Sequence, residues 1–483
     1  MKRWLFLLWL AVLAGLLGLY ARHLQADFPN YSPWTDWAKF TDEGWYGDAA
    51  IRHALFGRWD VPGEFNPGAA LPVLPFCEAA VFHFTGVTLA AARALAVSFF
   101  AGSLAGIFFL MKRYHSRVTA ALAITLLVLS PFNFAFLRLA ILEPPLLFFS
   151  VLLLLACAHA HWRRWGAMVS AGILLVAVAL TKTNGLAIVP AAIYLLWRAN
   201  HRDIGRWLRA LVVIGSVAIA LGAAYAALVV LTGHAADFRY FFWANATDQL
   251  TLHSRWDALR GALADGMWAD PWIYPAACAV IVGAIVWLRR MGRDPLFGTC
   301  VWWLAGYLAF IAWHANLQPR YYVAALPAMV MLPCIVLEYA WRSRKRVLSA
   351  AILIVMAAAA VHDARLTLRW ASHPEYTYWD AAHSLADTIR EDPQPNRLLM
   401  SISGSEITLM THLRSVNDDF GTDELDVRLA EFRPGWYASW DDIDDGTLES
   451  IRKQYWVQWV AAWPAMDDPN RRVLTLWRLV PKR

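Results

Sequence analysis

Long apolar stretches alternate with short polar segments along most of the chain, up to about residue 363. A run of about 20 apolar residues can cross the hydrocarbon core of a bilayer as an α-helix. The pattern therefore predicts a polytopic α-helical membrane protein with about 11–13 transmembrane helices. The predicted spans run from Trp4 to about Tyr20 and then near residues 70–86, 89–111, 118–142, 144–160, 166–181, 185–197, 208–232, 272–288, 296–313, 321–339 and 347–363.

Two of these apolar blocks are interrupted. Ser130–Pro131 lies near the middle of the block 118–142, and a proline inside a helix breaks or kinks it. This block therefore forms either one span or two short helices, which leaves the number of spans between residues 69 and 143 open. The segment Thr181–Gly185 (TKTNG) separates two other apolar runs. Irregular backbone at membrane depth is tolerated where it lines a cavity.

Three longer segments are too polar to cross a membrane. Residues 21–68 predict a first external loop, in which the stretch GWYGDAAIRHALFG has apolar residues at helical spacing and indicates a short helix along the membrane surface. Residues 233–271 predict a second external loop. From 364 to 483 the chain is rich in Asp, Glu and Arg. One helical and three strand-like stretches there (LADTIRED, RLLMSIS, QWVAAWP and VLTLWRLVP) predict a small soluble α/β domain that follows a membrane domain over 1–363.

The positive charges indicate the orientation of the chain. Arg and Lys gather in the short segments HWRRW (161–165), WRANHRDIGRWLR (197–209), RRMGRD (289–294) and WRSRKR (341–346). Short loops with such an excess stay in the cytoplasm. We therefore expect a multi-pass protein of the inner (plasma) membrane, with a cytoplasmic N-terminus. Both long loops and the C-terminal domain would lie on the periplasmic or extracellular side.

Composition agrees with a membrane protein and argues against nucleic-acid binding and against a zinc site. Hydrophobic residues make up 59% of the chain and charged residues only 17%, against about a quarter in soluble domains. The net charge of +6 comes from the loops, so it indicates no nucleic-acid partner. The five Cys lie in or beside apolar runs, with neither a disulfide framework nor zinc-site spacing.

The acidic pair Asp42–Glu43 lies in the predicted first external loop, after the first span. Adjacent carboxylates near a membrane surface can accept a proton from a hydroxyl nucleophile, hold a divalent cation, or simply be solvated. The residues alone do not decide among these three interpretations, so a divalent cation stays a possible cofactor.

Three other charged residues lie in apolar surroundings, which is costly unless they are paired or functional. Glu143 follows the apolar stretch AFLRLAIL, in which Arg138 is the expected partner. Lys182 and Arg320 are expected at the outer leaflet, where each could either extend to the interface or bind a ligand. An Arg fork and a Lys point charge together suit a lipid-linked phosphate.

The order of these motifs resembles a known family. DEGWYGDAAIRHALFGRW, FNPGAALPVLPF, TGVTLAAARALAVSFFAG, LRLAILEPPLLFF, LTKTNG and PRYYVAALP follow one another as in the bacterial branch of the dolichyl-phosphate-mannose–protein mannosyltransferases. That branch includes the lipid A aminoarabinose transferases, and its members are GT-C glycosyltransferases. The resemblance covers about residues 1–363 and is densest over 36–190. Two positions depart from the family pattern: Asn66-Pro67-Gly68 replaces Lys-Pro-Pro, and Glu143 stands where Asp is commoner.

The resemblance implies a GT-C fold and a glycosyltransferase that takes a sugar from a polyprenyl-phosphate donor, with inversion. The acceptor would be the hydroxyl of a lipid, glycan or protein on the outer side of the membrane. Asp42 would be the base, with Glu43 supporting it or helping to hold a metal. Lys182, Arg320 and Tyr321 would bind the donor phosphate. The supporting residues would be Glu143, Arg138, Arg93 and Asn66.

Three other functions remain as alternatives. One is a non-catalytic member of the same fold that binds a lipid-linked glycan, although the intact Asp42 argues against it. A polytopic polysaccharide polymerase or ligase would also use lipid-linked sugars, although its largest loop usually comes late in the chain. A transporter or flippase of lipid-linked glycans would predict internal repeats, and the sequence shows none.

Overall fold

The computed structural model describes residues 3–161, 163–241, 252–286, 291–314, 318–418, 424–466 and 472–482. The chain forms two compact units that interleave in sequence. The first unit comprises Met1–Arg22, Ala96–Arg138 and Leu142–Ser372, and the second comprises His23–Leu95, Leu139–Ile141 and His373–Arg483. The second unit therefore combines the predicted first loop, and the predicted span near residues 70–86, with the C-terminal region.

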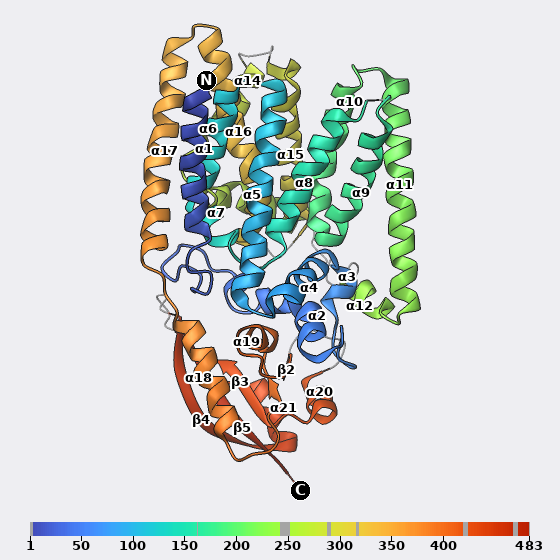
Figure 1. Ribbon diagram of the computed structural model, residues 1–483, viewed down its shortest axis with the longest axis vertical. Coiled ribbons are helices and arrows are strands. Elements are labelled where there is room, and N and C mark those ends of the chain that lie inside the picture. Colours follow the sequence, from blue (N-terminus) through green and yellow to red (C-terminus); the bar gives the residue numbers. More distant parts are fainter. Residues whose placement is uncertain are drawn as a thin grey trace. The chain divides into compact units, whose positions relative to one another are not determined.

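The first unit is helical, and its helices lie side by side as a bundle (Figure 1). Its described elements are α1 (Arg3–Tyr20), most of α5 (Leu89–Tyr114), α6 (Arg117–Leu129), α7 (Pro131–Phe136), α8 (Glu143–His159), α9 (Trp165–Thr181), η2 (Thr183–Ile188), α10 (Val189–Ala199), α11 (Ile204–Leu231), α12 (Ala235–Arg239), α13 (Leu252–Asp265), η4 (Gly266–Trp268), α14 (Ile273–Val286), η5 (Met291–Arg293), α15 (Pro295–Trp313), η6 (Pro319–Ala324), α16 (Leu326–Arg342) and α17 (Arg346–Ser372). Residues 242–251 of the predicted second external loop lie outside the described residues.

Polar caps and prolines determine where several of these helices begin and end. Ser116, Asp203 and Asp294 accept backbone N–H groups at the starts of α6, α11 and α15, as helix N-caps do. Ser130 ends α6 and caps the short α7, so the block 118–142 is broken at the predicted Ser130–Pro131 position. The predicted interruption after Thr181 is also present, because Lys182 has an extended backbone.

The chain is an integral multi-pass membrane protein. Six described helical segments are long and apolar enough to cross a membrane: Arg3–Tyr20, Leu89–Tyr114, Ile204–Leu231, Pro295–Trp313, Pro319–Arg342 and a run that starts at Arg346. Five shorter apolar helices accompany them: Val73–Thr85, Arg117–Leu129, Glu143–His159, Trp165–Thr181 and Ile273–Ala284. The predicted fold class, a polytopic helical membrane protein, is confirmed.

Burial differs strongly among the helices of the first unit. In the segment that contains α16, 83% of the apolar window is buried, and α16 packs against α6, α14, α15 and α17. In α1 and α11, only 6% and 11% of the window is buried. Apolar side chains that are exposed over a whole helix face suit a lipid environment. The core of this unit therefore surrounds α16, while α1 and α11 present apolar surface outward.

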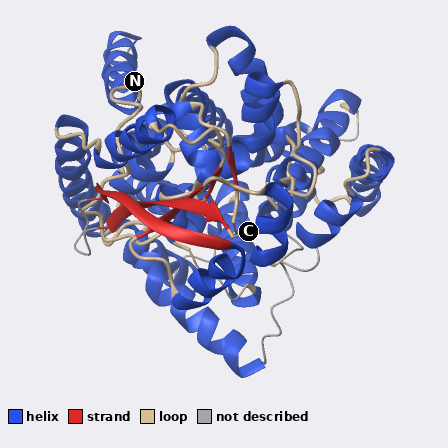
Figure 2. Cartoon of the chain, turned by 90° about the horizontal axis from the view of Figure 1, so that it is seen from below, coloured by secondary structure: helices blue, strands red, loops and turns tan. Residues whose placement is uncertain are grey.

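The second unit contains the only β-sheet among the described residues (Figure 2). Its elements are η1 (Trp37–Lys39), α2 (Asp42–Phe56), α3 (Pro67–Ala70), α4 (Val73–Thr85), α18 (Thr377–Glu391), β1 (Leu399–Met400), α19 (Gly404–Thr411), β2 (Ser415–Val416), α20 (Leu425–Phe432), β3 (Trp436–Trp440), α21 (Asp445–Gln454), β4 (Tyr455–Met466) and β5 (Arg472–Pro481). The strand order is β2-β1-β3-β5-β4; β1 is parallel to β2 and β3, and the other pairs are antiparallel. The predicted C-terminal α/β region is thus a small mixed sheet with helices.

Alternation along the strands gives this sheet two apolar faces. Trp436 and Ala438 of β3 pack into a core formed with α18 and α19. Tyr437 points to the opposite face and packs with Leu429 of α20 and Ile451 of α21. The first core also contains Phe40 and residues of α2, α4 and the start of α5. The loop after the first span and the C-terminal region therefore share one hydrophobic core.

The helix predicted in the first loop forms as α2, and its position along the membrane surface stays a prediction. Eleven consecutive residues, Asp42 to Arg52, are buried in the second unit. The helix therefore packs on several sides, instead of presenting a single apolar face.

Candidate active site

Breaks in the helices of the first unit bring three charged side chains together. Glu143 is the first residue of α8, where a carboxylate is favoured by the positive end of the helix dipole. Lys182 lies between the end of α9 and η2, with φ −163° and ψ 134°. Arg320 is in the 3₁₀ segment η6. All three side chains are thus positioned at points where regular helix begins or is interrupted.

The contacts within this cluster are short and buried. Lys182 Nζ lies 2.5 Å from Glu143 Oε1, and Arg320 Nε lies 3.7 Å from the same oxygen. The side chains of Lys182, Arg320 and Glu143 are only 9%, 7% and 1% exposed. Lys182 Nζ also lies 4.6 Å from the ring centroid of Tyr321, in cation–π range. Two cations therefore share one carboxylate in an apolar unit, and an aromatic ring contacts the lysine.

Arg138 does not pair with Glu143, which corrects the partner expected from sequence. Arg138 Nε donates to the carbonyl of Tyr20 at 3.0 Å, and its Nη2 donates to the carbonyl of Arg22 at 2.7 Å. Its guanidinium also lies 4.5 Å from the ring centroid of Phe134. Arg138 thus binds carbonyls at the end of α1. Proximity in sequence misled the prediction, because the irregular stretch between α7 and α8 directs the two side chains to different neighbours.

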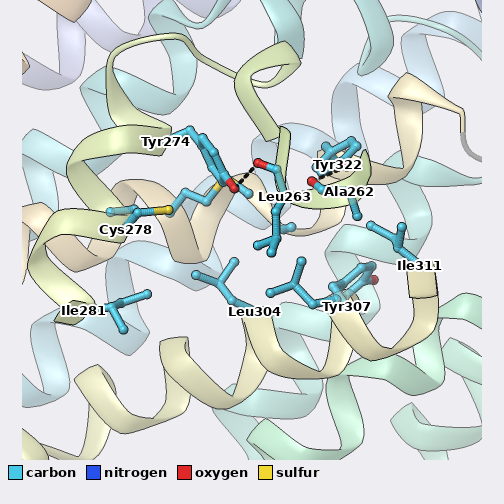
Figure 3. A pocket seen from close by; sticks show the side chains of 13 residues that line it. Ala262, Leu263, Tyr274, Cys278, Ile281, Leu304, Tyr307, Ile311 and Tyr322 are labelled. Atoms are coloured by element: carbon cyan, nitrogen blue, oxygen red, sulfur yellow. Dashed lines mark hydrogen bonds between the residues drawn. The ribbon is translucent and has the colours of Figure 1, made fainter. Parts of the chain in front are cut away.

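An apolar pocket lies close to this cluster in the same unit (Figure 3). It has an empty volume of about 510 Å³ and is lined by residues of α13, α14, α15, η6 and α16. Tyr322 and Tyr274 line it with their rings, and their hydroxyls donate to the backbone carbonyls of Ala262 and Leu263. The polar atoms of both tyrosines are therefore engaged, and the pocket offers an apolar surface. Tyr322 directly follows Arg320 and Tyr321 in η6.

In the second unit, Asp42 and Glu43 open helix α2 and differ in their surroundings. Asp42 Oδ1 accepts a hydrogen bond of 3.1 Å from the hydroxyl of Thr41. Glu43 is held by Arg93, whose Nε and Nη2 donate to its two oxygens at 2.7 and 2.5 Å. Glu43 Oε1 also accepts the backbone N–H of Ala140 at 2.7 Å. Glu43 is therefore fixed by a bidentate guanidinium and a backbone amide, which indicates a positioning role.

Two carboxylates that the sequence analysis did not select belong to the same cluster. Glu78 of α4 and Glu406 of α19 are 1% and 3% exposed, and both interact electrostatically with Glu43. Glu406 Oε2 accepts the backbone N–H of Gly44 at 2.6 Å. An acid within the apolar run VLPFCEAAVFHF is the same signal that singled out Glu143, so Glu78 was detectable from sequence. Glu406 had no such signal, because it lies in the mixed segment SGSEIT rather than in a long apolar run.

Burial changes the acidity of Glu406. Loss of water around the carboxyl, together with the charge of Glu43, raises the pKa of Glu406 well above its usual range. The backbone N–H of Gly44 and the charge of Arg93 act in the opposite direction but are outweighed. A neutral carboxylic acid at this position is consistent with its surroundings, because Glu43, Asp42 and Glu78 all interact with Glu406.

The other predicted supporting residue, Asn66, caps a helix. Its side chain accepts the N–H of Gly68 at 3.0 Å at the start of α3. A buried ionic network lies in the same unit: Arg52 binds Asp48 at 2.5 Å and Glu64 at 2.7 Å, and Arg428 of α20 binds Glu64 at 3.3 Å. Burial raises the pKa of Glu64 to about 7 despite the charge of Arg52.

No group of three or more His, Cys, Asp or Glu side chains that could hold a metal ion occurs among the residues that the structure describes. In particular, both oxygens of Glu43 already accept hydrogen bonds.

Part of the chain matches a known protein family. Residues 71–241 match the family of dolichyl-phosphate-mannose-protein mannosyltransferases. The match confirms the resemblance that the motifs predicted. It includes Arg93, Arg138, Glu143 and Lys182, whereas Asp42 and Arg320 lie outside the matched residues. No curated protein sequence matches the chain at a significant level.

Solved structures share the fold over nearly the whole chain. The crystal structure of ArnT from Cupriavidus metallidurans bound to undecaprenyl phosphate has a TM-score of 0.66 and 14% identity, and the match covers 99% of this chain and 98% of ArnT. The archaeal oligosaccharyltransferase AglB from Archaeoglobus fulgidus, in complex with an inhibitory peptide and a dolichol-phosphate, has a TM-score of 0.58 and 12% identity over 100% of this chain and 77% of AglB. The arabinofuranosyltransferase AftD from Mycobacteria has a TM-score of 0.52 and 15% identity over 100% of this chain and 40% of AftD. The fold is thus ArnT-like, of the GT-C type.

Proposed function

We propose that the protein is an integral membrane glycosyltransferase that moves a sugar from a polyprenyl-phosphate donor to an acceptor hydroxyl. The acceptor would lie on the outer side of the membrane, and the anomeric centre would be inverted. The observation that carries the proposal is the buried cluster of Lys182, Arg320 and Tyr321 around the single carboxylate of Glu143.

The charge of this cluster suits a phosphodiester headgroup. Two cations and one carboxylate leave one net positive charge inside an apolar unit, and a polyprenyl-phosphate sugar carries one negative charge. A buried cation is costly unless it is paired, so an incoming phosphate would take part of the role that Glu143 has now. Arg320 would supply a planar fork and Lys182 a point charge.

The apolar pocket next to η6 suits a lipid-linked donor. A polyprenyl chain cannot leave the membrane, so its phosphate must be bound at the depth of the headgroups. ArnT and AglB, which share this fold, were solved with undecaprenyl phosphate and dolichol-phosphate. By analogy, we assign the first isoprene units of the donor to the pocket that Tyr322 and Tyr307 line.

In the proposed reaction, Asp42 removes the proton from the acceptor hydroxyl, and the resulting oxygen attacks the anomeric carbon. The bond between this carbon and the phosphate oxygen breaks, and polyprenyl phosphate leaves with the electron pair. The leaving phosphate gains a second negative charge, which Lys182 and Arg320 neutralise. Stabilisation of a charge that develops in the transition state is commonly the largest catalytic contribution. Glu43, clamped by Arg93, would orient the start of α2.

The remaining assignments follow the positive-inside pattern and the resemblance. The N-terminus would be cytoplasmic, while both long loops and the C-terminal α/β region would lie on the periplasmic or extracellular side. The acceptor would be a lipid, a glycan or a protein, and the C-terminal region would help to select it.

The test is sugar transfer in membranes from radiolabelled polyprenyl-phosphate sugars. We expect wild-type protein to label an acceptor and Asp42→Asn to lose transfer by about 100-fold or more, as for loss of a general base. The matched control is Asp380→Asn, which changes an exposed acid of α18 in the same unit. Binding of polyprenyl phosphate without transfer from any donor would instead favour a transporter or a non-catalytic protein that binds a lipid-linked glycan. Equal transfer by Asp42→Asn would exclude Asp42 as the base.

A further inference from the structure

The first turn of α2 lacks the cap that its own sequence would normally supply. The first N–H groups of a helix need acceptors from outside the helix, commonly a Ser, Thr or Asp side chain at the N-cap. Thr41 occupies the N-cap position, but its side chain makes no capping hydrogen bond. Its hydroxyl instead donates to Asp42 Oδ1.

Glu406 provides the missing acceptor from more than 360 residues further along the chain. Its Oε2 accepts the N–H of Gly44, the third residue of α2, at 2.6 Å. Helices α2 and α19 lie against each other (Figure 1). A Cβ atom at position 44 would lie only 2.2 Å from the backbone nitrogen of Glu406. Glycine at position 44 is thus required for this approach.

The same part of the C-terminal region also holds the chain on the other side of the acidic pair. The carbonyl of Phe40 accepts hydrogen bonds of 3.0 Å from the hydroxyls of both Ser403 and Tyr378. Ser403 is in turn oriented by Trp440, whose ring nitrogen donates to its hydroxyl at 2.8 Å. The two residues that flank 41–43 are therefore both bonded to the C-terminal region.

We propose that Glu406 is a positioning residue, which caps α2 in trans and so fixes Asp42 and Glu43 for the transfer reaction. This inference rests on the proposed function. It gives the C-terminal region a part in catalysis besides acceptor selection. Because the carboxyl groups of Asp42, Glu43 and Glu78 lie around Glu406, and Arg93 is bonded to Glu43, the cap functions as a neutral carboxylic acid.

Glu406→Gln and Glu406→Leu should have different effects on kcat. Glu406→Gln keeps an oxygen of the same reach and resembles the neutral acid, so we expect kcat within about threefold of wild type. Glu406→Leu keeps a similar volume without an acceptor, so we expect kcat to fall about 10- to 30-fold, as expected for loss of a helix cap that holds a catalytic group. The KM for the donor should change by less than about twofold. Glu449→Leu, at an exposed position of α21, is the matched control.

Amide hydrogen exchange at Gly44 gives a readout that does not depend on activity. The N–H of Gly44 should exchange at least about tenfold faster in Glu406→Leu than in wild type or Glu406→Gln. Ser403→Ala, which removes one of the two donors to Phe40, supplies a milder variant should Glu406→Leu fail to fold; we expect a two- to fivefold loss of kcat. Wild-type rates in both Glu406→Leu and Ser403→Ala, or a Glu406→Gln variant as slow as Glu406→Leu, would overturn the proposal. If wild type transfers no sugar but Gly44 exchange responds as expected, the cap stands and the proposed function fails.

Discussion

The charged clusters of the two units have opposite balances. In the first unit, Lys182 and Arg320 share Glu143, and Arg320 approaches it only to 3.7 Å. In the second unit, the carboxyl groups of Glu43, Glu406 and Asp27 interact with Arg93, which holds Glu43 through two short bonds. The buried acids Asp42 and Glu78 interact in turn with Glu406. The first cluster has an excess of positive charge, and Arg320 is held by Glu143 less closely than Lys182 is, as suits a site that takes up a further anion. The second has an excess of carboxyl groups in a fixed frame, as suits a site that holds a base.

We therefore expect binding of the donor and the chemical step to depend on different clusters. Changes in the first cluster should alter the affinity for polyprenyl phosphate. Changes in the second should alter the rate of transfer while the affinity stays near that of wild type. If variants in either cluster changed the affinity and the transfer rate equally, the two clusters would not have separate roles.

The largest effect on affinity is expected from Lys182→Ala. Loss of a charge-assisted hydrogen bond costs about 1.5–3 kcal/mol, which corresponds to roughly 10- to 100-fold weaker binding of polyprenyl phosphate. Lys182→Arg should retain most of the affinity, and Lys112→Ala, at an exposed lysine of α5, should retain all of it. Binding to purified protein by a labelled polyprenyl phosphate measures this. Unchanged affinity in Lys182→Ala would show that the phosphate binds elsewhere.

A smaller effect, on rate alone, is expected from Arg93→Lys. Lysine keeps the charge but cannot form the two parallel bonds to Glu43, so the start of α2 loses part of its support. We expect kcat to fall about tenfold, with polyprenyl-phosphate affinity within twofold of wild type. Arg93 also donates to the carbonyl of Leu24 at 2.9 Å, so the thermal stability of the variant should be recorded beside its kinetics. An equal loss of affinity and rate would contradict the separation of the two clusters.

Glu143→Gln tests whether the carboxylate of the first cluster competes with the donor phosphate. If Glu143 competes with the phosphate for Lys182 and Arg320, its neutral analogue should raise the affinity for polyprenyl phosphate about three- to tenfold. Product release would then slow, and kcat would fall by a similar factor. Weaker binding in this variant would show instead that Glu143 orients the two cations for the phosphate.

Sequence patterns predicted the helical framework well, because membrane spans and their interruptions are local. The breaks at Ser130–Pro131 and after Thr181 were visible as polar or proline-containing gaps in apolar runs, and the structure has both. The C-terminal strands QWVAAWP and VLTLWRLVP lie within β4 and β5. RLLMSIS forms only the two-residue β1, since the chain turns into α19 directly afterwards.

Partners that meet through folding were much harder to predict. Glu143 was expected to pair with Arg138, five residues away, yet it binds Lys182 and Arg320, which are 39 and 177 positions further on. Glu406 reaches Gly44 across the whole membrane region of the sequence. Local sequence patterns do not predict contacts between residues so far apart in the chain. The charge type of each cluster was therefore predictable, while the members that complete it were not.

The smallest predicted effect concerns the ionic network at Glu64, which lies in the second unit and bears on its stability. Burial raises the pKa of Glu64 from 4.5 to about 7 in the folded protein. Between these two pH values the folded state binds more protons than the unfolded state, so the free energy of unfolding that Glu64 contributes falls as the pH rises. Glu64→Gln does not titrate. The Tm of the variant relative to wild type should therefore increase between pH 5 and pH 8, by roughly 2–5 °C, in thermal unfolding of the solubilised protein. Glu449→Gln, at an exposed position, should run parallel to wild type over this range. If Glu64→Gln also runs parallel, Glu64 is ionised throughout, held by Arg52 and Arg428; the excess of unpaired acid in the second unit would then be confined to the group around Asp42.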